Sequence, residues 1–137
     1  MRRFEFTAPL LICCLFIAGC DDFSGSHLVS ACEDAIKSKL KAPSTYKRIE
    51  ARSSSSILSR DEFEIQLMQA GFGEEARVNS LRGYDSKDFK PALFSVELSY
   101  DAANSFGVPL RSTAHCSYFG QFGEVSTASS YNVKLDM

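Results

Sequence analysis

The sequence has little of what usually marks an enzyme or a metal-binding protein. Its 137 residues include two histidines, His27 and His115, and no two cysteines stand in the C-x-x-C spacing. It has no G-x-S-x-G elbow, phosphate-binding loop or dinucleotide fingerprint, and no S-x-x-K accompanied by its supporting motifs. We therefore expect no catalytic residue, no bound metal and no cofactor.

Long apolar runs and basic stripes are also missing. The apolar run nearest the N-terminus covers residues 8–18, and a membrane-spanning helix needs about 20 apolar residues. Basic residues do not gather into a stripe with interleaved aromatic residues, so nucleic acid is not an expected partner. The apolar run is too short to remain in a membrane, but its length suits a secretory leader.

The residues around that run carry the most specific signal in the chain. Arg2 and Arg3 precede it, and Ile17-Ala18-Gly19-Cys20 closes it in the order aliphatic, small, small, cysteine. This end resembles the lipobox of bacterial lipoproteins. The resemblance implies a leader at residues 1–19, a diacylglyceryl group on the Cys20 sulfur, and anchoring of the mature chain by membrane lipid. The alternative is an ordinary secretory leader with Cys20 as a third thiol.

The segment after Cys20 indicates where the protein resides. Residues 20–26 form a short tether with a reach of about 20 Å, and residues 27–137 are long enough for one small domain. Asp21 resembles the signal that retains enterobacterial lipoproteins at the inner membrane. We therefore expect a domain held against the periplasmic side of the cell membrane.

The cysteines divide by their place in the chain. Cys13 and Cys14 leave with the leader and Cys20 carries lipid, so Cys32 and Cys116 remain as an even pair in an oxidising compartment. We predict a disulfide between them, and the alternative is two buried free thiols. Removal of the leader leaves 13 of the 15 basic and 16 of the 17 acidic residues, a net charge near −3.

The first half of the domain has mixed patterns. Apolar residues at spacings of three and four predict a helix over 27–41 that buries Cys32 and ends before Pro43. Residues 46–53 alternate as an edge strand, and 53–56 read as a loop. A capping-box pattern at Ser59 favours a helix over 61–70, where a strand also fits. Residues 73–91 read as a long loop with room for one short element.

The C-terminal third predicts a three-stranded antiparallel meander. Apolar and polar residues alternate over 94–103, 110–119 and 124–135, with turns between them. The fold class is therefore α+β, with the N-terminal helix packed on a small antiparallel sheet, a possible fourth strand at 46–53 and a helix–sheet disulfide. Alternation places His115 on the face opposite Cys116, so His115 is a surface histidine and no Cys/His pair forms.

Three further motifs resemble one group of proteins. The chain has an LK-x-P-S-T turn at 40–45, an A-x-N-x-F-G hairpin at 102–107 and a closing Cys116. This pattern is similar to that of small uncharacterised bacterial exported and lipoprotein domains, relative to which 59–90 looks like an insertion. The resemblance supports the fold prediction and implies no activity.

These features favour a non-enzymatic interaction or assembly module of the cell envelope with a protein partner. The first candidate surface is the predicted hairpin tip, Asn104, Phe106 and Gly107, together with the loop at 73–91. Asn104, Phe106 and Gly107 suit the turn itself, and the alternative for Phe106 is insertion into a partner from the hairpin tip. Two alternatives stay open: a small hydrolytic enzyme and a small-ligand-binding lipoprotein.

Overall fold

The computed structural model describes residues 25–137, so the predicted leader, Cys20, Asp21 and most of the predicted tether lie outside the described residues. The described chain is α+β, with a four-stranded antiparallel sheet in the order β1-β2-β3-β4. In chain order the elements are α1 (Gly25–Lys39), the 3₁₀ helix η1 (Pro43–Thr45), β1 (Lys47–Ile57), α2 (Arg60–Gln69), α3 (Glu74–Asp85), β2 (Pro91–Ala103), β3 (Pro109–Gln121) and β4 (Lys134–Asp136).

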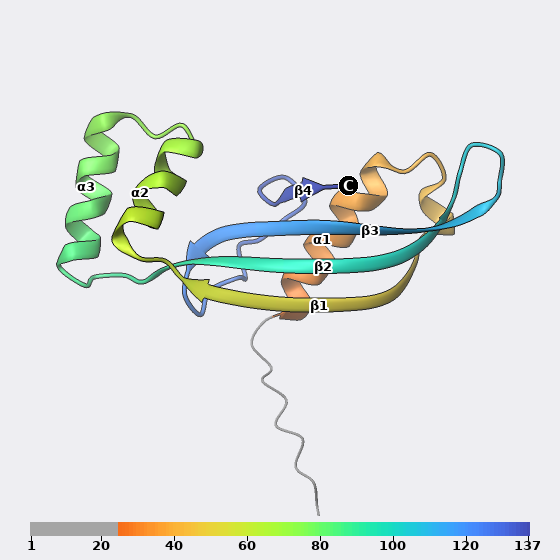
Figure 1. Ribbon diagram of the computed structural model, residues 1–137, viewed down its shortest axis with the longest axis horizontal. Helices are drawn as coiled ribbons and strands as arrows, with labels where there is room; N and C mark the ends of the chain where they lie inside the picture. The colour runs from red at the N-terminus through yellow and green to blue at the C-terminus, as the bar shows by residue number, and fades with distance from the viewer. Residues whose placement is uncertain (1–24) are drawn as a thin grey trace, which may run out of the picture.

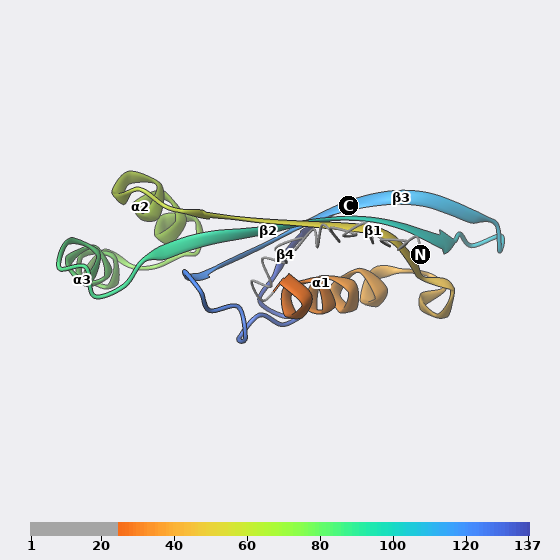
Figure 2. The same cartoon turned by 90° about the horizontal axis from the view of Figure 1, so that it is seen from below.

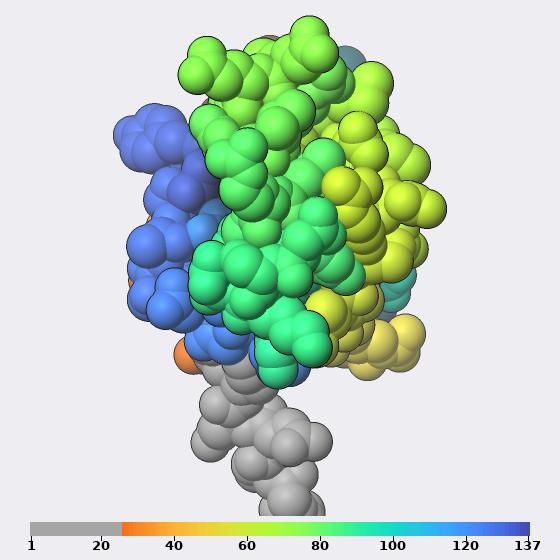
Figure 3. Space-filling model, turned by 90° about the vertical axis from the view of Figure 1, so that its left-hand side faces the viewer, coloured from red at the N-terminus to blue at the C-terminus, as the bar shows by residue number. Residues whose placement is uncertain are grey.

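The helices occupy two separate places around the sheet. Helix α1 crosses one face of the sheet, and the segment between β3 and β4 lies on the same side (Figure 2). Helices α2 and α3 form a hairpin beyond one end of the long strands, opposite the β2–β3 turn (Figure 1). Seen from that end, the two helices cover much of the molecule (Figure 3). The second face of the sheet carries no helix from the described part of the chain.

Strand β2 supplies the centre of the main core. Alternate residues from Phe94 to Ala102 are all buried, as the sequence pattern predicts, and they pack with apolar residues of α1, including Leu28 and Ile36. Because side chains alternate along a strand, this period of two leaves the other face of β2 polar. The one-sided pattern fixes which face α1 covers.

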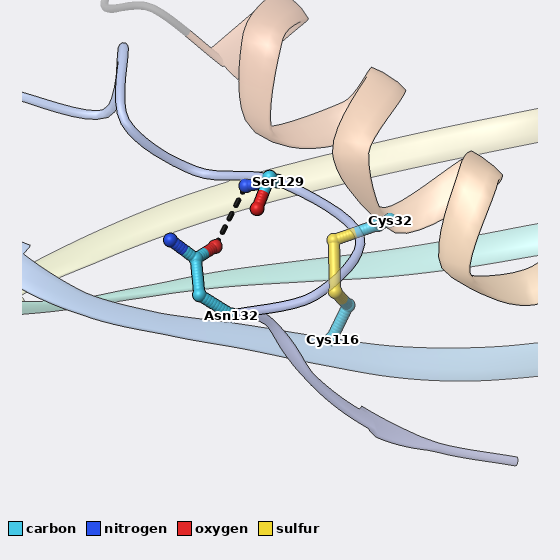
Figure 4. The surroundings of a disulfide bond; sticks show 4 residues. All are labelled: Cys32, Cys116, Ser129 and Asn132. Carbon is cyan, nitrogen blue, oxygen red and sulfur yellow. Dashed lines mark hydrogen bonds between the residues drawn. A yellow bond between two sulfur atoms is a disulfide. The ribbon is translucent and has the colours of Figure 1, made fainter.

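A disulfide joins α1 to the sheet and confirms the predicted pairing of Cys32 with Cys116. The two Cα atoms are 6.0 Å apart, and both residues are buried. Figure 4 shows the bond passing from α1 to β3, next to the loop in which the Ser129 amide donates a 2.7 Å hydrogen bond to the Asn132 side chain. The helix is therefore held to the sheet by a covalent bond in the middle of the core.

The prediction of a loop at Ser53–Ser56 is wrong. These serines continue β1 and pair in register with Val96 to Leu93 of β2, although all of β1 is exposed. Backbone hydrogen bonds alone extend the strand here, and they leave no apolar pattern in the sequence. The edge position predicted for this strand is confirmed by the strand order.

The segment between β1 and β2 is a helical hairpin. The capping box at Ser59 and Glu62 is present, with the Glu62 carboxylate accepting from the Ser59 amide at 2.8 Å, so the helical alternative for 61–70 is confirmed. The loop predicted at 73–91 is wrong, because Glu74–Asp85 forms α3. This helix buries Leu81 alone, so its helical pattern is weak in the sequence.

The hairpin has a core of its own. Leu58, Phe63, Leu67 and Leu81 are buried together, separately from the main core. The Phe63 ring lies 5.5 Å from Phe89 and 5.8 Å from Phe119, centroid to centroid. Phe119 therefore links the hairpin to the sheet.

The last predicted strand is largely wrong. Regular pairing with β3 is restricted to β4, Lys134–Asp136, and residues 122–133 form turns. Val125 and Ala128 are buried in the main core at a spacing of three, which a tight turn allows and a strand does not. Val125, Tyr131 and Val133 alternate in the sequence as strand residues do, but their side chains do not lie on one face of the sheet. The alternation was therefore misleading here.

Replacing both bonded cysteines with alanine should strongly destabilise the domain. The bond closes a loop with a sequence separation of 84, and the chain-entropy relation assigns such a loop about 4 to 5 kcal/mol. Urea unfolding of the Cys32→Ala/Cys116→Ala variant, compared with oxidised and reduced wild type, measures this difference. A loss below about 1 kcal/mol, the size of an ordinary substitution, contradicts the expectation.

Candidate functional site

The β2–β3 turn is built by one asparagine side chain. Asn104 Oδ1 accepts hydrogen bonds from the amides of Phe106, at 2.9 Å, and Val108, at 3.0 Å. The Gly107 amide donates to the Asn104 carbonyl at 3.0 Å, and Gly107 has φ = 77°, a conformation that favours glycine. Asn104 and Gly107 thus shape the turn, as the sequence predicts.

The same turn presents apolar side chains to solvent. Phe106 is 87 % exposed, and Val108 and Leu110 beside it are each about half exposed. Hydrogen bonds fix the backbone beneath the phenyl ring. A partner that buries Phe106 therefore loses little binding free energy to the ordering of this turn. We call Phe106, Val108 and Leu110 the tip patch.

An ion pair joins β2 and β3 next to the turn. Arg111 Nε and Nη2 donate to the two carboxylate oxygens of Asp101 at 2.9 and 3.0 Å, and these hydrogen bonds lower the pKa of the Asp101 carboxyl. A separate hydrogen bond, from the Ala103 amide to Thr45 Oγ1 at 2.8 Å, connects the end of β2 to η1. The LK-x-P-S-T turn thus supports the hairpin from the side.

The structure does not bring the two predicted parts of the interaction surface together. The β2–β3 turn and α3 lie at opposite ends of the sheet (Figure 1). The helical end has exposed apolar residues of its own, including Ile65, Met68 and Phe72 on and after α2. A small apolar cavity of about 240 Å³ lies there between Phe72, Phe63 and Phe119. The tip patch and this end are separate surfaces.

The uncovered face of the sheet carries a polar groove that the sequence analysis did not identify. Its volume is about 480 Å³. The strand register aligns a row of small and charged side chains along it: Ser54, Ser95, Ser117 and Lys134. A second aligned row lies next to the first: Arg52, Glu97, His115 and Asp136. Alternation in β2 and β3 places Ser95, Glu97, His115 and Ser117 on the face away from the core, but only the register shows that they align with one another and with residues of β1 and β4.

His115 lies at the surface, as predicted. His115 Nδ1 is 3.7 Å from Glu97 Oε2, and both side chains are largely exposed. Within residues 25–137, the interaction of the His115 side chain is with Glu97 and not with a serine hydroxyl, and no group of three or more His, Cys, Asp or Glu side chains is arranged to hold a metal ion. The groove therefore has polar side chains but lacks a positioned nucleophile–base pair.

Comparison with known proteins finds no match. No family model, no curated protein and no solved structure is similar to this chain. In residues 25–137, no helix has the length and apolar character needed to cross a membrane. The function must therefore be argued from the residues themselves.

Replacing Asn104 should loosen the tip. Asn104→Ala removes both hydrogen bonds from the side chain to the turn, and we expect a loss of about 1 to 2 kcal/mol in the free energy of unfolding. Asn104→Asp is the matched control, since its carboxylate keeps the acceptor oxygens. Amide hydrogen exchange at Phe106 and Val108 should accelerate in the alanine variant alone. Equal exchange in both variants would show that the side chain does not hold the turn.

Proposed function

We propose that this chain is a lipoprotein of the bacterial envelope, anchored through Cys20, whose folded domain is a non-enzymatic interaction module. The lipobox-like residues Ile17 to Cys20 support the anchor. Helix α1 starts at Gly25, five residues after Cys20, so the domain is held within about 18 Å of the lipid. The membrane is the inner one if Asp21 acts as a retention signal.

The tip patch is the observation that carries the interaction proposal. A phenyl ring that is 87 % exposed adds no burial energy to the stability of the fold. The backbone that carries this ring is nevertheless ordered by hydrogen bonds from a side chain. Burial of a phenylalanine against a partner contributes about 1.5 to 3 kcal/mol. Aromatic anchors on ordered backbone are typical of protein interfaces. The partner is therefore an envelope protein with an apolar pocket for Phe106.

A second candidate function has one observation in its favour. The polar groove on the uncovered face is lined by hydroxyl and charged groups, the kinds of group that small polar ligands use as hydrogen-bond partners. It is open on a sheet surface, whereas small-molecule sites usually enclose most of the ligand. The interaction module is therefore the better-supported proposal, and a hydrolytic site is the weakest of the three.

The anchor is tested by Cys20→Ala. Without the sulfur, the chain should accumulate as an unprocessed precursor that takes up no labelled fatty acid. The Cys32→Ser variant is the control, because it removes a cysteine that carries no lipid in this proposal. A Cys20→Ala protein that is still matured and still labelled would contradict the anchor.

The tip is tested by site-specific photo-crosslinking in membranes. A benzoylphenylalanine placed at position 106 should yield one discrete protein adduct, and the same residue at exposed Ser105 should yield much less. Against the partner identified from that adduct, Phe106→Ala should weaken binding about 10- to 100-fold, the effect of losing about 1.5 to 3 kcal/mol. Ser105→Ala should leave the affinity unchanged. Equal adducts at 105 and 106, or equal affinities, would rule out the tip as the interface.

A further inference from the structure

One edge of the sheet is open along a strand of 11 residues. Strand β1 pairs with β2 on one side, and every residue of β1 is exposed. Figure 1 shows β1 at the margin of the sheet, with no further strand of the described chain beyond it. Backbone amides and carbonyls along that margin are available to pair with another strand.

The two halves of β1 differ in how this edge is protected. The first half carries four charged residues, Lys47, Arg48, Glu50 and Arg52, and a register shift between Arg48 and Glu50. Charges and bulges are the usual devices that keep an edge from pairing. The second half, Ser53–Ile57, has no charge, no proline and no register shift. The backbone of this half is therefore free of the features that prevent pairing with another strand.

We propose that this half of β1 pairs antiparallel with β1 of a second copy, with the two-fold axis at Ser54. Two-fold symmetry limits the possible registers. An axis at Arg52 would oppose two arginines, and an axis at Glu50 would oppose two glutamates. An axis at Ala51 would draw the irregular stretch around Ile49 of both copies into the paired region.

The axis at Ser54 avoids these conflicts. It pairs Ser53 with Ser55 of the second copy and Arg52 with Ser56, and no like charges face each other. The paired region runs from Ala51 to Ile57, outside the register shift. An axis one residue further on would shorten it. This register therefore places the whole uncharged stretch, Ser53–Ile57, inside the longest paired region that stays clear of the register shift.

The groove on the uncovered face gives a second argument for a copy of the same chain. Its serine row ends at the open edge, on Ser54. When the two-fold axis is normal to the sheet, the Ser54 side chains of the two copies lie next to each other, and both are on the uncovered face. The row of Ser54, Ser95 and Ser117 then continues into the same row of the second copy, with a Lys134 at each outer end. The groove becomes continuous and symmetric, which an unrelated strand would not provide.

A cysteine on the axis tests this register. In Ser54→Cys, the two Cα atoms lie about 4.5 to 5.5 Å apart across the antiparallel pair, within the disulfide range of about 4.4 to 6.8 Å. The full chain, assayed in membranes on a non-reducing gel, should form a covalent dimer. Ile49→Cys, on the same strand, is the matched control, because its two copies would lie about 34 Å apart. We expect at least about tenfold less dimer from Ile49→Cys.

Charge substitutions next to the axis test whether the strands face each other as proposed. In the Ser54→Cys background, Ser53→Lys with Ser55→Lys opposes like charges twice and should reduce the dimer about tenfold. Ser53→Glu with Ser55→Lys changes the same exposed positions but opposes unlike charges, so the dimer should return to the Ser54→Cys level. The unlike pair also serves as the folding control.

Four results would overturn the proposal. Three of them are the absence of a Ser54→Cys dimer, an equal yield of dimer from Ile49→Cys, and equal yields from the two charge designs. An adduct of Ser54→Cys with a different protein, in place of the dimer, would assign the edge to another partner and would also overturn it.

Discussion

The burial of one face of β2 is the constraint on which the rest of the structure depends. Its alternate apolar residues from Phe94 to Ala102 must be shielded from water, and α1 packs over them. The Cys32–Cys116 bond holds that cover in place, since it joins the buried side of the helix to the neighbouring strand. Because a helix of 15 residues is about 22 Å long and a strand of 13 is about 43 Å long, one helix covers only part of the sheet.

That mismatch in length explains the other surfaces. At one end of the sheet, the α2–α3 hairpin forms a second core around Phe63 and reaches the sheet through Phe119. At the other end, the β2–β3 turn extends beyond any cover and leaves Phe106 in solvent. Between them, β1 lies outside the main core and keeps an open edge. The tip patch, the open edge and the uncovered face are all parts of a long sheet that one short helix does not cover.

The sequence predicts those parts whose side chains carry the periodicity. The buried face of β2, the α1 helix and the disulfide follow from alternation, helical spacing and the pairing of two remaining cysteines. The tip residues were found because Asn and Gly mark a turn. Elsewhere the pattern is absent or misleading. Helix α3 buries only Leu81, Ser53–Ser56 pair through backbone alone, and Val125 and Ala128 are buried from a turn. The groove depends on register between strands, which no local pattern contains.

The proposed lipid anchor would change which of these surfaces bind strongly enough to act. Pairing of seven residues along one edge buries much less than the roughly 1,200 to 2,000 Å² of a stable interface, so two free copies would associate weakly. Chains held by lipid in one membrane meet at a far higher effective concentration, and an interaction of modest intrinsic affinity then becomes populated. A single exposed phenylalanine gains in the same way. A lipid anchor at Cys20 would thus explain how a small domain with a short tip and a short open edge makes specific contacts without a large apolar surface, which would be a liability before the chain reaches the membrane.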